Sequence, residues 1–211
     1  MTDAHFHRGG YPAFLAIEGE ERRFYGIHPW QTESFPPDIS ALRAALESDL
    51  AAGVGEIGLD RLRSREISPA QRDAFMRQLE LAAEMRRPVV LHGAKCWGEV
   101  VKACVPFKDR IPSFLFHGFS RSLGLLPEIF AMNGFISIGP ALLNDHAVNY
   151  RDMAAKLPID RLLVETDASW DDSDAQGSQI AAIIERFAVL RGTSAADLSA
   201  AISANLVRFA G

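Results

Sequence analysis

The chain has 211 residues, of which 48% are hydrophobic, and its formal net charge is −5. This acidic balance argues against a general nucleic-acid binder, since such binding depends on neutralising phosphates, so any phosphate chemistry must rest on a local site. No stretch approaches about 18 apolar residues and no export signal opens the chain, so we expect a cytoplasmic protein without a membrane span. We further expect one domain over residues 1–211 with no obligate protein partner, and we expect its two cysteines, Cys96 and Cys104, to be reduced and buried.

Seven short apolar stretches are predicted as strands, and amphipathic stretches separate most of them. In chain order the strands are 2–7, 22–29, 53–60, 87–93, 113–119, 134–139 and 161–168. The helical stretches include 35–53, 68–87, 178–192 and 193–211, and the second of these opens with Ser68, Pro69 and Gln71 in a capping-box pattern. This alternation of strands and helices predicts a parallel α/β fold.

The first strand, "TDAHFH", carries three side chains that can bind metal ions. Because side chains alternate along a strand, Asp3, His5 and His7 share one face. Neighbours on that face are about 7 Å apart, close enough for two imidazoles to reach a common ion. The alternative is an N-terminal strand that bears two half-exposed histidines.

Most of the histidines, together with several carboxylates, lie at the C-terminal ends of predicted strands. In a (β/α) barrel these ends converge on the face that carries the active site. Taken singly, each residue could be a satisfied core histidine, a helix cap or a solvated acid. The residues at these strand ends are His5, His7, His28, Glu56, Asp60, His92, His117, Glu165 and Asp167. Four histidines together with Glu56 and Asp167 supply the nitrogen and oxygen donors of a two-metal hydrolase site.

The chain resembles the TatD family of metal-dependent deoxyribonucleases, a branch of the amidohydrolase-like barrels. The resemblance rests on "DAHFH", "GIHPW", "VGEIGLD", "PVVLHG", "FHGFS", "GFISIG", "LLVETDAS" and the terminal "NLVRFAG". It implies a divalent-metal-dependent hydrolase that cleaves phosphodiester bonds at DNA ends through a metal-bridging water. The alternatives are a metal-dependent amidase or lactonase acting on a small molecule, and a non-catalytic metal-binding protein.

The resemblance also implies a set of metal ligands. His5 and His7 would bind one ion, His92 and His117 a second, and Glu56 would bridge the two. Asp167 would return to the first ion and move a proton, which makes Glu56 and Asp167 the expected catalytic residues. The ions would be Zn, Mn or Mg, because imidazole suits the first and carboxylates the others. Asp3, Asp60 and Glu165 are expected to hold the imidazoles or the bridging carboxylate in orientation.

Four residues are expected to bind the substrate, which would be DNA or another phosphodiester. His28 could bind a phosphate or shape the "HP" turn, and Trp30, which stands where the family usually has a histidine, could stack on a nucleobase. Arg61 and Arg63 follow the third strand and could hold phosphates through their planar guanidinium groups. The alternative for both arginines is a solvated loop paired with nearby acids.

The connection between His7 and His28 is unusually short. Its twenty residues cannot hold both a full helix and a strand, so we expect a distorted TIM-like (β/α) barrel with seven clear parallel strands. The short segment should form a short helix or an extended flap. An antiparallel hairpin of residues 13–18 with 22–27 is the alternative. Either arrangement should lower the wall beside His5 and His7 and leave the cleft open.

Overall fold

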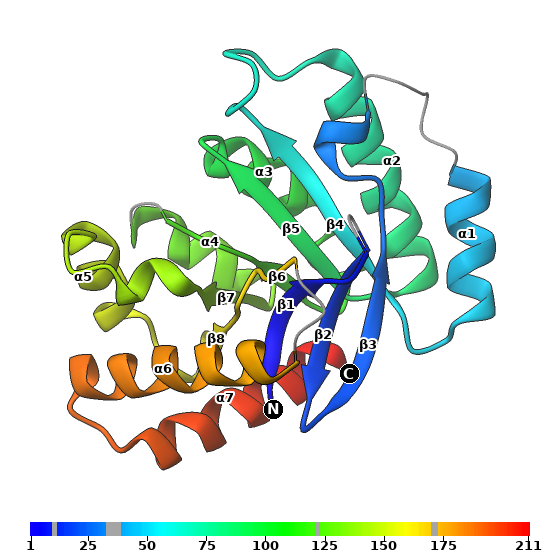
Figure 1. Ribbon diagram of the computed structural model, residues 1–211. Coiled ribbons are helices and arrows are strands. Elements are labelled where there is room, and N and C mark those ends of the chain that lie inside the picture. The colour runs from blue at the N-terminus through cyan, green and yellow to red at the C-terminus, as the bar shows by residue number, and fades with distance from the viewer. Residues whose placement is uncertain (10–11, 33–38, 121–122, 170–172) are drawn as a thin grey trace.

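One eight-stranded sheet forms the centre of the protein in the computed structural model, which describes residues 1–9, 12–32, 39–120, 123–169 and 173–211 (Figure 1). The strands follow one another around the sheet in sequence order. They are β1 (Asp3–His7), β2 (Ala13–Ile17), β3 (Glu20–Tyr25), β4 (Gly53–Asp60), β5 (Val89–Ala94), β6 (Phe114–Phe116), β7 (Gly134–Ile138) and β8 (Leu162–Val164).

The sheet curls until its two edge strands meet. The backbone N–H of Asp167, just after β8, donates to the carbonyl of His5 at 3.0 Å, and the N–H of His7 donates to the carbonyl of Ala168 at 2.7 Å. These two bonds nearly close the barrel along a seam between β1 and β8. The predicted TIM-like α/β barrel is therefore confirmed.

In the described part of the chain, seven helices lie outside the sheet (Figure 1). They are α1 (Ile39–Ser48), α2 (Pro69–Met85), α3 (Trp97–Cys104), α4 (Leu126–Ala131), α5 (Val148–Lys156), α6 (Ser173–Arg191) and α7 (Ala195–Ala210). Short 3₁₀ turns occur at η1 (Pro29–Gln31), η2 (Val105–Phe107), η3 (Leu123–Leu125), η4 (Pro140–Leu143) and η5 (Ile159–Arg161). Within the described residues, no helix has the length and apolar character needed to cross a membrane.

The short connection after β1 forms a hairpin, so the predicted helix or flap is wrong and the alternative is right. β2 pairs antiparallel with both β1 and β3, whereas β3 to β8 pair parallel. Of the eight described strands, seven therefore share one direction and β2 opposes them. Glu18 and Gly19 form the two-residue turn with φ of 53° and 98°, the double positive φ that tight hairpins require and that glycine adopts freely.

The predicted helix over 68–87 forms as α2, with one difference at its start. Ser68 caps the helix by accepting the N–H of Gln71 at 3.2 Å. The Gln71 side chain, however, does not return to Ser68 as a capping box requires. Its carbonyl oxygen accepts the backbone N–H of Asp60 at 3.0 Å, so this residue ties α2 to the end of β4.

Candidate metal centre

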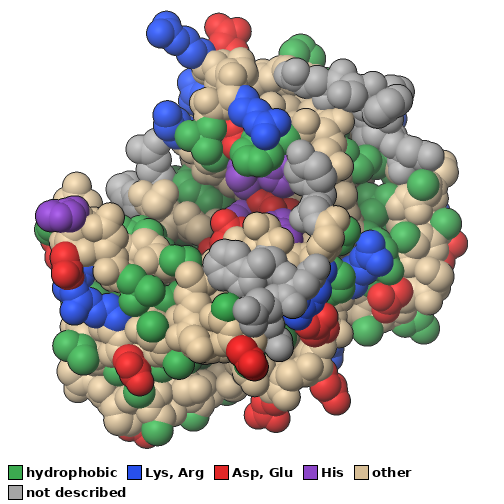
Figure 2. Space-filling view, viewed as in Figure 1, with side chains coloured by type: hydrophobic (Ala, Val, Ile, Leu, Met, Phe, Trp, Pro, Cys, Tyr) green, Lys and Arg blue, Asp and Glu red, His purple; other side chains and the backbone are tan. Residues whose placement is uncertain are grey.

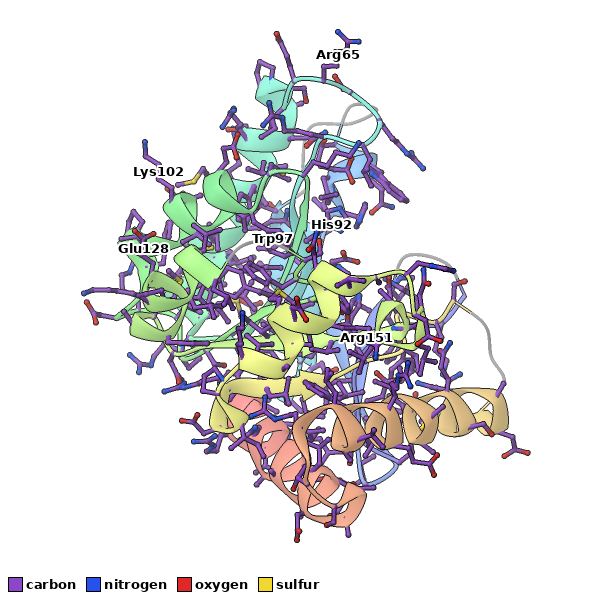
Figure 3. The ribbon with its side chains drawn as sticks, turned by 90° about the vertical axis from the view of Figure 1, so that its left-hand side faces the viewer. Arg65, His92, Trp97, Lys102, Glu128 and Arg151 are labelled. Atoms are coloured by element: carbon purple, nitrogen blue, oxygen red, sulfur yellow. The ribbon has the colours of Figure 1, made fainter. Side chains whose placement is uncertain are left out.

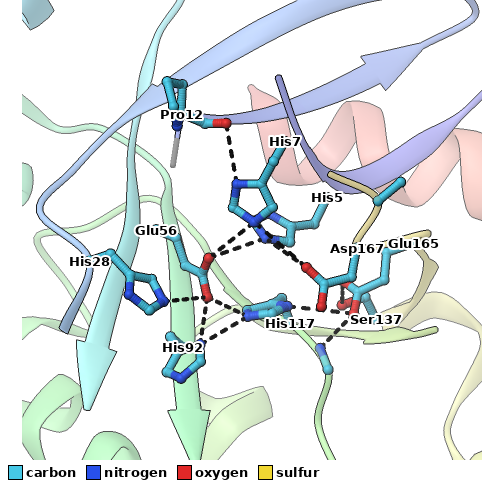
Figure 4. A network of polar contacts seen from close by, with 12 residues as sticks. His5, His7, Pro12, His28, Glu56, His92, His117, Ser137, Glu165 and Asp167 are labelled. Atoms are coloured by element: carbon cyan, nitrogen blue, oxygen red, sulfur yellow. Dashed lines mark hydrogen bonds and ion pairs between the residues drawn. The ribbon is translucent and has the colours of Figure 1, made fainter. Parts of the chain in front are cut away.

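Glu56 lies at the centre of a ring of imidazoles at the C-terminal end of the barrel (Figure 4). Its side chain is 3% exposed, and each of its two oxygens faces a different pair of histidines. Oε2 lies 3.4 Å from Nε2 of His5 and 3.5 Å from Nε2 of His7. Oε1 lies 2.6 Å from Nδ1 of His92 and 2.6 Å from Nε2 of His117. The carboxylate therefore stands between two imidazole pairs, which is the position that a bridging ligand needs.

Strand alternation and one glycine explain part of this placement. Glu56, Gly58 and Asp60 follow each other on one face of β4, and Gly58 is paired with His92 of β5. A Cβ at Gly58 would lie 2.0 Å from the His92 carbonyl oxygen, so only glycine permits this close approach. The imidazole of His92 consequently reaches Glu56 through Nδ1 and Asp60 through Nε2, the latter at 2.8 Å.

Two histidines donate a hydrogen bond from the ring nitrogen that faces away from Glu56, and a third has a carboxylate near that nitrogen. In His7, Nδ1 donates to the carbonyl of Pro12 at 3.3 Å, and in His92, Nε2 donates to Asp60. In His117, Nδ1 faces Glu165 at 3.6 Å. A proton on the outer nitrogen leaves the inner nitrogen with a free lone pair, the state that binds a metal ion.

His28 has the opposite arrangement. Its Nδ1 accepts the backbone N–H of Trp30 at 3.2 Å and so caps η1, while its Nε2 lies 3.7 Å from Oε1 of Glu56. The neutral ring must then carry its proton on Nε2, which makes the inner nitrogen a hydrogen-bond donor rather than a metal ligand. This geometry is compatible with both roles considered for His28, since Nδ1 shapes the turn and Nε2 faces the site where a phosphate could bind.

Asp167 reaches the centre from the loop after β8. Its side chain is 50% exposed, and Oδ1 lies 3.7 Å from Nε2 of His5 and 3.6 Å from Nε2 of His7. Its backbone has a φ of 50°, in the left-handed region that residues with a side chain rarely adopt. The fully buried Asp3 holds this loop, because it accepts both the N–H and the hydroxyl of Thr166 and also the Gln176 amide. The hydrogen bonds of Asp3 to described residues are thus with backbone N–H groups and with the Thr166 and Gln176 side chains, and its expected role in orienting an imidazole or the bridging carboxylate stays a prediction.

The charges of the metal-free site depend on one another. Burial disfavours the charged imidazolium of His7, but hydrogen bonds with Asp167 and Glu56 outweigh it and raise the pKa of His7 to about 10. Burial would likewise raise the pKa of Glu56, yet the surrounding imidazoles, His117 foremost, hold that pKa well below its usual value. Glu56 is therefore ionised, and without a metal its charge is balanced by protonated histidines.

Several positioning residues were missed by the sequence analysis. Gln78, buried in α2, accepts the backbone N–H of Ile27 at 2.6 Å and donates to its carbonyl at 3.1 Å, which fixes the chain immediately before His28. Ser137 donates to Glu165, which also accepts the N–H of Gly118 at 2.7 Å. The sequence held one signal for Gln78, because a glutamine inside the apolar stripe of a helix is expected to be buried and a buried polar group needs a hydrogen-bond partner.

The arginine loop follows β4, and the guanidinium groups of Arg61 and Arg63 have partners within the protein. The guanidinium of Arg61 pairs with Glu99 at 3.1 Å. The guanidinium of Arg63 stacks on the Trp30 ring, 3.8 Å from its centroid. Arg65 points outward (Figure 3). The predicted phosphate contacts of Arg61 and Arg63 stay predictions, and in this structure both side chains have partners within the protein.

The site opens to solvent through a hollow of about 490 Å³. Histidine and carboxylate atoms are visible at its floor (Figure 2). It is lined by Ser169 and by seven of the expected site residues, which are His7, His28, Trp30, Glu56, His92, His117 and Asp167. The hollow reaches Glu56 itself, so a substrate can approach the central carboxylate directly.

The residues present fit divalent ions. Ligand atoms lie within 4.8 Å of one another in two overlapping groups, His5–His7–Glu56 and His5–His117–Asp167. A third group, His28–Glu56–His92, is equally close, but it includes the His28 ring, whose inner nitrogen carries its proton. His5 is fully buried, and neither of its ring nitrogens makes a hydrogen bond within the described residues. A buried polar group left without a partner is costly, and an ion held by Nε2 would remove that cost.

The chain is similar to several known proteins of one family. The family described as TatD related DNase matches residues 16–211. A protein of Erwinia tasmaniensis named 3'-5' ssDNA/RNA exonuclease TatD is 30% identical over 195 residues, which cover 87% of this chain and 75% of that protein. A protein of Escherichia coli named uncharacterized metal-dependent hydrolase YcfH is 24% identical over 189 residues, with 87% and 71% covered.

Solved structures are similar as well. The crystal structure of YJJV, a TatD homolog from Escherichia coli, has a TM-score of 0.74 at 27% identity and covers 88% of this chain and 75% of that one. A hydrolase TatD family protein from Entamoeba histolytica, at 17% identity with 86% and 72% covered, has a TM-score of 0.72 and shares the fold.

Proposed function

The chain belongs to the family of TatD-related deoxyribonucleases, and from this membership and the geometry of the site we propose that it is a divalent-metal-dependent phosphodiesterase acting on DNA ends. The observation that carries the proposal is the Glu56 carboxylate, whose two oxygens face two different imidazole pairs. The runner-up, an amidase or lactonase acting on a small molecule, is not favoured by the relatives, one of which is named an exonuclease.

His5, His7 and Asp167 would hold one ion, His92 and His117 the other, and Glu56 both. The two ions supply Lewis-acid stabilisation of the phosphoryl oxygens and ease the ionisation of water near neutral pH. Imidazole and carboxylate donors occur together here, so the donor set admits Zn, Mn or Mg.

Asp167 is proposed to move the proton. Burial would raise its pKa, but the hydrogen bond with His7 and the nearby histidine charges lower that pKa, so the carboxylate is ionised and can accept a proton. A water oxygen then forms the new bond to phosphorus while the bond to the leaving oxygen breaks. The proton taken from the water by Asp167 passes to that leaving oxygen, which balances the hydrolysis.

His28 and Trp30 are proposed to contact the substrate. Nε2–H of His28 faces Glu56 at the floor of the hollow that His28 lines, and it would donate to a phosphate oxygen bound there. Trp30 lines the same hollow and can contact a base, although the guanidinium of Arg63 occupies one face of its ring.

Metal-reconstituted protein tests the proposal. With Mg, Mn or Zn, it should shorten an end-labelled linear single strand and leave a circular single strand intact, because the circle has no end. Elemental analysis after reconstitution should approach two ions per chain. Cleavage of the circle would contradict action at ends, fewer than one ion per chain would contradict the paired site, and turnover of amides or lactones alone would support the runner-up.

A further inference from the structure

The candidate metal centre lies where two hollows meet. The first, the Trp30 lobe, is the hollow of about 490 Å³ described above. The second, the Lys95 lobe, has a volume of about 370 Å³, and its lining includes Leu62, Lys95, Trp97 and Ser120. Both lobes are lined by His92, His117 and Asp167. A substrate held at these three residues can therefore extend to both sides.

Lys95 is the one lysine or arginine among the described residues that line either lobe. Its side chain is exposed and has no ion pair or hydrogen bond to another described residue, so its ammonium group is available. The loop arginines that could have competed for a phosphate are engaged with Glu99 and Trp30. The carboxylate that also lines the Lys95 lobe is Asp167, and a bound ion would neutralise it.

The backbone at Lys95, beside the Lys95 lobe, has a strained conformation. Lys95 is the residue between the end of β5 and the cap of α3, and its φ is 58°. This left-handed conformation favours glycine, so a lysine in it is a strained choice. Backbone strain of this kind gathers at functional sites, where the surrounding structure enforces it.

The other lining residues of the Lys95 lobe suit a nucleoside. Trp97 is 4% exposed and packs near Phe116 and Phe119, so its ring is a fixed part of the wall. Leu62 is 57% exposed at the lobe and offers apolar surface to a ligand. The volume lies within the range of small-ligand pockets, and apolar walls with one cation match a base and a phosphate.

We propose that Lys95 binds the phosphate adjacent to the scissile one, with the intervening nucleoside in the Lys95 lobe. This rests on the proposed function, because it places the scissile phosphate at the metal centre. It means that the protein discriminates between a polynucleotide and an isolated phosphodiester by a second phosphate contact. The bonds broken and formed are those of the proposed hydrolysis.

The test compares two substrates and three variants. Bis(4-nitrophenyl) phosphate has one phosphodiester and no neighbouring phosphate, whereas a single-stranded oligonucleotide has both. Lys95→Met should lower kcat/KM for the oligonucleotide about tenfold and reduce its salt dependence by about one charge, while changing kcat/KM for the small diester less than about twofold. Lys95→Arg should restore most of the loss. Lys102→Met is the control, because Lys102 points outward from α3, away from His92 (Figure 3).

The outcomes separate the two proposals. If the unmodified protein hydrolyses neither substrate with any of the three metals, the proposed function fails and this inference with it. If it hydrolyses both and Lys95→Met leaves the oligonucleotide rate and its salt dependence unchanged, only the role of Lys95 is refuted. An equal loss on both substrates would also refute it, since that pattern indicates damage to the metal centre.

Discussion

Replacing Glu56 with glutamine should damage the protein far more than replacing Asp60 with asparagine, although both carboxylates touch His92. Glu56 approaches four histidine nitrogens within 3.5 Å, whereas Asp60 contacts one imidazole at 2.8 Å and the backbone N–H groups of Leu62 and Arg63 at 2.7 and 3.3 Å. Glutamine keeps the volume of the side chain but loses the charge and one potential ligand oxygen. It therefore weakens both ion sites at once.

Asp60→Asn should disturb the metal ligands through one imidazole, that of His92. The asparagine oxygen can still accept the two backbone N–H groups, so its amide NH₂ would face Nε2 of His92 and reverse the tautomer of that ring. Changes to a residue that orients a metal ligand typically cost about 10–100-fold in metal affinity or activity. We expect Asp60→Asn within that range and Glu56→Gln beyond about 100-fold.

Metal content after reconstitution and hydrolysis of a phosphodiester would be measured for both variants, with circular dichroism as the control for folding. Glu56→Gln should retain less than one ion per chain, and Asp60→Asn should retain more. Equal losses in the two variants would refute the central, bridging position of Glu56.

Three further predictions follow from the contacts at the site. Asp167→Asn should keep the fold and much of the metal yet lose about 10²–10⁴-fold in turnover, because the amide cannot accept the proton; an Asn variant near the parental rate, in steady-state assays, would remove Asp167 from proton transfer. Because the pKa of His7 is raised to about 10 in the metal-free protein, metal affinity should rise with pH towards that value and binding should release protons, measurable by calorimetry in buffers of different ionisation enthalpy. A metal affinity that does not change with pH would contradict the raised pKa of His7. The same pKa shift means that protonated His7 stabilises the metal-free fold fully below about pH 6.5, and that this stabilisation is lost as the pH rises through about 10. Gln78→Ala should lower the free energy of unfolding by about 1–3 kcal/mol in urea titrations, since it leaves the partly buried N–H and carbonyl of Ile27 without the Gln78 side chain as their partner. Arg77→Ala, on the exposed side of α2, should change the free energy of unfolding by less than about 0.5 kcal/mol.

Strand periodicity was sufficient to bring most of the metal-competent residues to one place. Asp3, His5 and His7 alternate on β1, and Glu56 and Asp60 alternate on β4, so each strand presents its polar residues together wherever it lies in the barrel. Parallel pairing then brings the strand ends to the same face, which is why the fold and the cluster could both be predicted from local patterns.

Long-range contacts explain what sequence reasoning could not supply. Whether Arg61 and Arg63 meet a phosphate depends on Glu99 and Trp30, which approach them only in the folded chain. The hairpin after β1 was one of several options because residues 13–18 are apolar enough for a strand or a short helix. Pairing with β1 on one side and β3 on the other decides between them.

Because the candidate metal centre spans the seam between β1 and β8, metal binding would affect how cooperatively the barrel holds together. Among the described residues, two backbone hydrogen bonds cross the seam, from His7 to Ala168 and from Asp167 to His5. Because so few bonds hold it, the seam is a place where the barrel can open locally at little cost in free energy. The ligands proposed for one ion lie on both sides of it, with His5 and His7 on β1 and Asp167 beyond β8. An ion held there would join the two ends of the sheet as a crosslink joins distant parts of a chain, and would couple the first strand of the protein to its last. Hydrogen exchange at the amides of His7 and Asp167 would then slow on metal loading more than exchange at amides in the middle of the sheet.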